Sequence, residues 1–143
     1  MKKIIIAIIS AMILMPTMAD AQIQKTRSYS TKTIKSVRTG FITLYHSDCY
    51  WLGMSTTNQF DQAILIKLGE TKEIAIQSLK DLIEIYESLK SSGGSQYITN
   101  GWGEELRTYK IGMALCFSAP GRAGYANMSK GEMEKFITAL EKE

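Results

Sequence analysis

Residues 63–89 read AILIKLGETKEIAIQSLKDLIEIYESL, and this stretch contains both kinds of element from which we expect the fold to be built. The nearly continuous apolar run Ala63–Leu68 predicts a strand that is buried on both faces, and therefore a central strand of a sheet. From the expected N-cap Thr71, apolar residues recur at three- and four-residue spacing, which predicts an amphipathic helix. Glycines after Leu89 end this helix. A helix of this kind buries its apolar face by packing against a sheet.

Further strands are expected before this stretch. β-branched and aromatic residues are concentrated in Thr33–Val37, Thr39–Tyr45 and Cys49–Met54, which is the composition that strands favour. The polar turn 46–48 separates the last two segments. We expect these strands to belong to a mainly antiparallel sheet.

A second succession of strands and a helix is expected after the glycines. Gln96–Thr99 is predicted to form a short strand, and Leu106–Phe117 the longest one, with its odd-numbered residues facing the core. Ser129 to Glu132 has the pattern of a capping box, which predicts a last amphipathic helix. The fold class is therefore α+β: a single domain with a mainly antiparallel sheet of five to six strands and two helices packed on one face. A duplicated β-β-α unit is a further hypothesis, although the two copies share few identical residues.

The amino terminus has the three parts of a secretory signal peptide. Two lysines precede an apolar run of about a dozen residues, which is too short to cross about 30 Å of hydrocarbon, and small residues stand at Ala19 and Ala21. We therefore expect residues 1–21 to be a signal peptide, 22–32 a polar leader and 33–143 the domain. The protein should then be periplasmic or secreted, with no stable membrane anchor after cleavage.

The charge of the chain bears on its partners. Seventeen basic and fourteen acidic residues give a formal net charge of +3, which is small for a chain that binds through phosphate contacts. The densest group of basic residues lies near the expected leader, where it is explained by solvation. We therefore expect no nucleic-acid partner.

Two cysteines, Cys49 and Cys116, follow the expected cleavage site. An exported protein reaches a compartment in which a disulfide between them would persist. Cysteine is also among the most frequently buried residues, so two buried free thiols are the other interpretation. Spacing alone does not decide between the two, because a bridge requires the Cα atoms to lie within about 7 Å.

Catalysis is suggested only by the neighbours His46 and Cys49, because an imidazole can activate a thiol as a nucleophile. Catalytic pairs of this kind are usually distant in sequence, and a buried cysteine after a polar turn explains the residues equally well. A single histidine does not make a zinc cluster, and phosphate-binding or dinucleotide-binding motifs are missing from the sequence. We expect no cofactor and no metal, and a small hydrolase or transferase using Cys49 with His46 is the alternative function.

Four aromatic residues form the candidate binding surface: Trp102, Tyr97, Trp51 and Tyr50. Tryptophan and tyrosine supply a large contact area with a polar tip, which suits them to recognition. Trp102 lies in the turn Asn100–Gly103, whose glycines leave little room to bury an indole, so we expect its ring to be partly exposed. Core packing of these rings is the competing interpretation. The sequence favours a non-catalytic exported domain that binds a protein, peptide or glycan.

Overall fold

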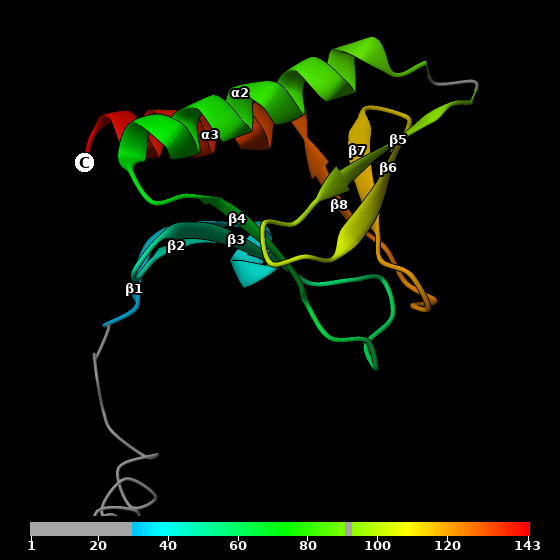
Figure 1. The fold of residues 1–143 in the computed structure, drawn as a ribbon, viewed down its shortest axis with the longest axis horizontal. Coiled ribbons are helices and arrows are strands. Elements are labelled where there is room, and N and C mark those ends of the chain that lie inside the picture. The colour runs from blue at the N-terminus through cyan, green and yellow to red at the C-terminus, as the bar shows by residue number, and fades with distance from the viewer. Residues whose placement is uncertain (1–29, 91–92) are drawn as a thin grey trace, which may run out of the picture.

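A computed structural model describes residues 30–90 and 93–143. It contains two antiparallel sheets of four strands, and each sheet is followed in the chain by one helix (Figure 1). The expected α+β class is confirmed. The expected single sheet of five to six strands is wrong, because the strands divide into two sheets, and the succession of four strands and a helix occurs twice. The predicted signal peptide, 1–21, and most of the leader, 22–32, lie outside the described residues.

The first sheet is a meander in the order β1-β2-β3-β4. Its strands are β1 Lys32–Val37, β2 Ile42–His46, β3 Tyr50–Met54 and β4 Ile64–Gly69. The prediction that Ala63–Leu68 is a central strand is wrong, since β4 lies at the edge of this sheet. The apolar residues of β4 lie on both faces of the sheet. Ile64 and Ile66 point into the core, whereas Leu65 is exposed on the outer face.

The second sheet is also a meander, in the order β5-β6-β7-β8. Its strands are β5 Ser95–Thr99, β6 Glu105–Ile111, β7 Ala114–Ser118 and β8 Ala126–Ser129. The last of these strands was not expected from the sequence. It is short and leads directly into the final helix, so its four residues resemble a loop in composition.

The long strand predicted over Leu106–Phe117 is instead the β6–β7 hairpin. Gly112, at φ +57°, turns the chain so that Ile111 pairs with Ala114. The turn also changes which residues face the core, because even-numbered residues such as Leu106 point inward in β6. Met113, which was expected in the core, is 82% exposed at the tip of the hairpin, and Ile111 is half exposed.

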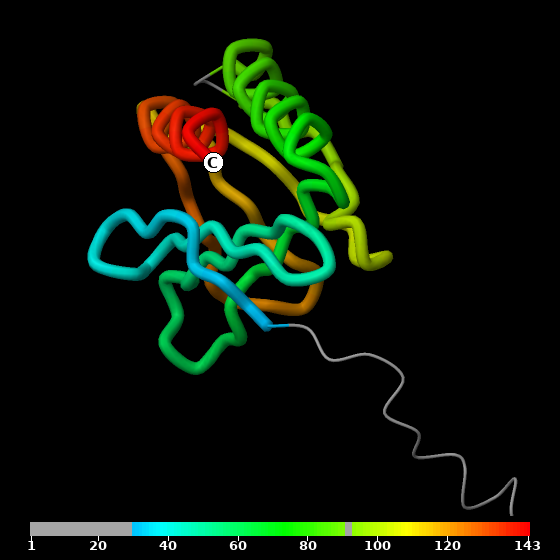
Figure 2. Tube along the Cα trace, turned by 90° about the vertical axis from the view of Figure 1, so that its left-hand side faces the viewer, coloured from blue at the N-terminus to red at the C-terminus, as the bar shows by residue number. Residues whose placement is uncertain are grey.

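Both helices begin where the sequence predicts. Helix α2 spans Lys72–Ser88, and the side chain of Thr71 accepts a hydrogen bond from the backbone N–H of Ile74 at 3.3 Å. Helix α3 spans Lys130–Glu141 and begins with the complete Ser129/Glu132 capping box. The helices lie side by side, with α2 on β3 and β4, and with α3 against β1 and β8 (Figure 2). Neither helix of the described residues is long and apolar enough to cross a membrane.

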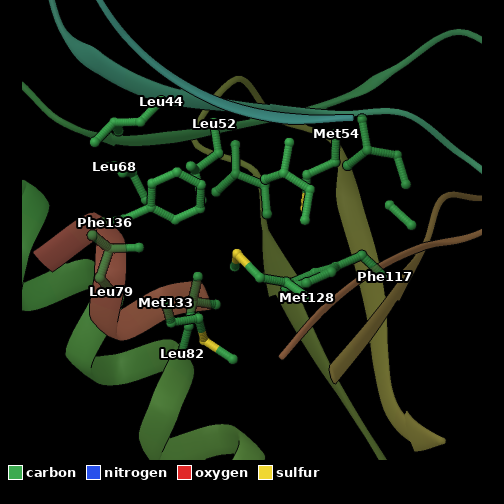
Figure 3. Packing of buried hydrophobic residues seen from close by; sticks show 14 of the residues in the cluster. Leu44, Leu52, Met54, Leu68, Leu79, Leu82, Phe117, Met128, Met133 and Phe136 are labelled. Carbon is green, nitrogen blue, oxygen red and sulfur yellow. The ribbon is translucent and has the colours of Figure 1, made fainter. Parts of the chain in front are cut away.

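One hydrophobic core joins both sheets and both helices (Figure 3). Each sheet and each helix contributes side chains that are almost completely buried: Leu44, Leu52 and Met54 from the first sheet, Phe117 and Met128 from the second, Leu79 and Leu82 from α2, Met133 and Phe136 from α3. Because one core needs all of these elements, the described residues form a single domain. Each sheet has one face in this core, which leaves its outer face available for function.

Candidate binding surface on the first sheet

Three aromatic rings form a row on the outer face of the first sheet. Tyr45 in β2 and Trp51 in β3 are directly opposite each other in register, and their rings stack with centroids 4.3 Å apart and an interplanar angle of 21°. Trp102, from the loop between β5 and β6, meets Trp51 in a T-shaped contact with centroids 6.5 Å apart. Such pairs favour a fixed relative orientation of the rings. We call Tyr45, Trp51 and Trp102 the aromatic row.

Gly53 lies beneath side chains that converge over the sheet. A Cβ atom at this position would lie 3.3 Å from Cε2 of Tyr45 and 3.6 Å from Cζ3 of Trp51. It would also lie 3.6 Å from Cδ2 of the exposed Leu65, which extends the apolar surface onto β4. The absence of a side chain at Gly53 therefore lets the rings lie close to the strand.

Asn100 is only 5% exposed, and its side chain forms hydrogen bonds within the loop that carries Trp102. Its Oδ1 atom accepts hydrogen bonds from the backbone N–H groups of Trp102 at 2.9 Å and Glu104 at 3.0 Å. Its Nδ2 atom donates to Oε2 of Glu104 at 3.2 Å, and its backbone N–H donates to the carbonyl of Glu104 at 2.9 Å. Asparagine is suited to this role because its side chain can bond to the backbone a few residues further on.

The same loop is fixed to the edge of β4. The backbone N–H of Lys67 donates to the carbonyl of Asn100 at 2.7 Å. Gly101 lies against this strand at φ +86°, and a Cβ atom on it would be 2.6 Å from Cβ of Lys67. Glycine is needed here for both the backbone conformation and the close approach. A salt bridge of 3.5 Å between Glu104 and Arg122 ties the loop to the segment after β7.

Trp102 is 50% exposed although its loop is held on several sides. The partial exposure predicted from its glycine-flanked turn is thus confirmed. An exposed aromatic ring on an ordered loop loses little further freedom when a ligand covers it, which lowers the entropic cost of binding. Tryptophan is also among the residues that contribute most to binding energy at interfaces.

The four aromatic candidates do not form one surface. Tyr50 precedes Trp51 in β3 and so points to the opposite face, where its buried ring stacks on His46 with centroids 4.1 Å apart. Tyr97 is exposed, but it lies on the second sheet, opposite Arg107. Among the described residues, no aromatic contact joins Tyr97 to the row. Tyr45 was not among the candidates, and its position beside Trp51 follows only from the strand register.

The two cysteines are unpaired and buried. Cys49 lies in the turn between β2 and β3 of the first sheet, whereas Cys116 lies in β7 of the second sheet. The disulfide interpretation is therefore not realised in the structure, which has the two buried free thiols. Burial raises the pKa of both thiols, and the carboxylate of Asp48 raises that of Cys49 further. Less thiolate is then present at neutral pH, which is the opposite of what an activated nucleophile needs.

Four hollows on the described part of the surface are lined by none of the three residues of the aromatic row. One of them, about 520 Å³, lies between β1 and α3 and is lined by Lys35, Lys135 and Lys142 among others. No group of three or more His, Cys, Asp or Glu side chains in 30–90 and 93–143 is arranged to hold a metal ion. The aromatic row is thus an open surface and not an enclosed pocket.

Comparison with known proteins adds no assignment. No model of a protein family matches the chain. Neither a curated protein nor a solved structure matches it significantly. The function is therefore inferred from the geometry of the aromatic row and its supporting loop.

Proposed function

We propose that this chain is an exported, non-catalytic binding domain that captures a protein, peptide or glycan on the aromatic row. The observation that carries the proposal is the half-exposed ring of Trp102 on a loop held by Asn100, Gly101 and Glu104. Asn100 also stabilises the fold, so it is the ring itself that supports binding: a large aromatic side chain stays half exposed on a loop whose backbone is fixed. The hydrogen bonds of Asn100 and the exposure of Trp102 together support recognition.

The exposed half of Trp102 is large enough to matter energetically. A buried tryptophan removes about 150–250 Å² from water, so half exposure leaves roughly 100 Å². At about 25 cal/mol per Å², a ligand that covers this part of the ring gains about 2.5 kcal/mol of binding free energy from hydrophobic burial. A gain of this size is typical of a dominant residue at an interface.

Groups at the border of the row can select the ligand. Lys67 pairs with Trp51 in the strand register, and its ammonium group is 3.7 Å from Glu70. The phenol of Tyr45 adds a hydroxyl group that both donates and accepts hydrogen bonds. Flat rings bordered by hydrogen-bonding groups suit a sugar ring or an aromatic or proline side chain of a peptide.

Selection of ligands on the immobilised protein tests this proposal, with a random-peptide display library and a glycan array as the probes. Trp102→Ala is compared with Phe60→Ala, because Phe60 is an aromatic residue, 86% exposed, in the β3–β4 loop away from the row. Selected ligands should bind Phe60→Ala as they bind the wild type, and Trp102→Ala at least about tenfold more weakly, which corresponds to about 1.4 kcal/mol. Equal binding to both variants would contradict the proposal.

Export is tested separately, by the mass of the full chain after expression in a secreting host. We expect signal-peptide cleavage to remove residues 1–21, so that the mature protein begins at Gln22. Retention of those residues by the exported protein would contradict cleavage after Ala21. Binding by the aromatic row does not depend on this result.

A further inference from the structure

The two sheets have four edge strands, and three of them are protected against pairing with another chain. β1 contains Lys32 and Lys35, and its register is irregular between Thr33 and Lys35. The edge of β4 is occupied where Lys67 bonds to the carbonyl of Asn100. β8 has only four residues and leads directly into α3. Lysines, irregular register, covering loops and short length are the usual means by which proteins protect sheet edges.

The fourth edge strand, β5, has none of these features. Its sequence Ser-Gln-Tyr-Ile-Thr, residues 95–99, contains no charge and no proline, and its pairing with β6 is regular over all five residues. All of its residues except Ile98 are exposed. Within the described part of the chain, only β6 pairs with it. Its outer backbone N–H and C=O groups are therefore available to another strand.

We propose that β5 pairs antiparallel with β5 of a second copy of this chain, around a two-fold axis at Tyr97. In this register Tyr97 lies opposite its own symmetry mate, Gln96 lies opposite Ile98, and Ser95 lies opposite Thr99. Each odd-numbered residue is paired with an odd-numbered one and each even-numbered residue with an even-numbered one. Because side chains alternate along a strand, the outer faces of the two sheets then lie on the same side. The two second sheets then form one continuous sheet, which is an isologous interface.

A second copy fits this edge because the strand is compatible with itself. A two-fold pairing places the central residue against its own copy, where like charges would repel, and β5 carries no charge. The nearest charged side chain in the same row is Arg107, opposite Tyr97 on β6. In the joined sheet the two copies of Arg107 would be three strand spacings apart, roughly 14 Å, beyond the screening length of about 8 Å at physiological salt. The Tyr97 rings would form a cross-strand aromatic pair.

The size of this contact indicates how tight the dimer should be. Five residues of strand pairing make a small interface, well below the roughly 1,600 Å² of an ordinary stable complex. We therefore expect a reversible dimer whose population rises with protein concentration. Each dimer would carry two aromatic rows, so a repetitive ligand could engage both.

Sedimentation equilibrium of the purified chain tests the pairing at protein concentrations from about 1 μM to about 1 mM, the range in which weak association is measurable. The wild type should dimerise reversibly. Tyr97→Lys and Tyr97→Glu, each alone, should weaken dimerisation at least about tenfold by placing like charges opposite each other. An equimolar mixture of these two variants should dimerise again, which requires both to be folded. Phe60→Lys, the same kind of change at an exposed aromatic residue elsewhere, should dimerise like the wild type.

Several results would overturn the proposal. A wild type that stays monomeric throughout this range would do so, even if it bound extended peptides from a library. Dimers that persist in both single Tyr97 variants would place the contact elsewhere. If the wild type dimerises but the mixture of Tyr97→Lys and Tyr97→Glu stays monomeric, the two-fold register at Tyr97 is rejected.

Discussion

Replacing Asn100 by alanine removes the side chain that holds the Trp102 loop. Two backbone N–H groups, those of Trp102 and Glu104, lose their acceptor, to which they donate at 2.9 and 3.0 Å. A buried donor without a partner costs about 1–3 kcal/mol. Asn100 itself is buried, but the loop it supports is partly exposed, so water can reach some of the freed groups. We therefore expect the lower end for each donor, and a total loss of about 2–3 kcal/mol.

Urea and thermal unfolding measure this loss. For a domain of this size, about 4 °C of melting temperature corresponds to each kcal/mol, so Asn100→Ala should melt about 8–12 °C below the wild type. Asn58→Ala is the matched control: the same side chain is removed from the β3–β4 loop, where Oδ1 accepts one exposed hydrogen bond from Phe60 N–H. The control should lose no more than about 1 kcal/mol.

Asn100→Asp separates the acceptor from the rest of the side chain. Aspartate keeps the oxygen that accepts from both N–H groups, but it loses the donation to Glu104 and places a negative charge beside that carboxylate. Its stability should lie between those of Asn100→Ala and the wild type. A loss below about 0.5 kcal/mol for Asn100→Ala, as at an ordinary surface position, would refute the role assigned to this residue.

Three further outcomes are expected. Trp102→Ala should lose about 2 kcal/mol, because half of the ring is already covered by contacts such as the one with Trp51. A loss of about 4 kcal/mol or more in urea unfolding would show that the ring is part of the core. Burial raises the pKa of Glu132, but hydrogen bonds from Arg38 and Ser129 outweigh this effect, so the pKa of Glu132 is lowered in the folded protein. The stability of the wild type should therefore fall as the pH drops through this pKa, and the stability of Arg38→Ala should fall less steeply. Identical acid-unfolding profiles of the two proteins would contradict this. The two buried cysteines, whose pKa values are raised by burial, should alkylate after denaturation without reduction and only slowly in the native state, and rapid native alkylation would contradict their burial.

Local chemistry explains what the sequence predicts correctly about the fold. Thr71 and Ser129 cap their helices through side-chain bonds to residues three positions away, so the signal lies within one turn. The exposure of Trp102 also follows from its immediate neighbours, because glycines on both sides cannot cover an indole.

Features that depend on distant residues could not be predicted. The division into two sheets is decided by how both sheets and both helices share one core. The β6–β7 turn at Gly112 interrupts an alternation that continues on both sides, so Leu106–Phe117 resembles one strand. In the candidate site, only the register of β2 and β3 places Tyr45 on Trp51. Alternation along β3 could have indicated that Tyr50 and Trp51 point to opposite faces.

Whether Trp102 forms a preformed binding surface is tested by its time-resolved fluorescence anisotropy in the Trp51→Phe variant. The chain has two tryptophans, so this variant reports on Trp102 alone. We expect acrylamide to quench the ring readily, and its anisotropy nevertheless to decay at the rate of overall tumbling, because the loop is fixed while the ring is exposed. Fast independent depolarisation of the ring, or protection of its emission from acrylamide, would contradict a preformed binding surface.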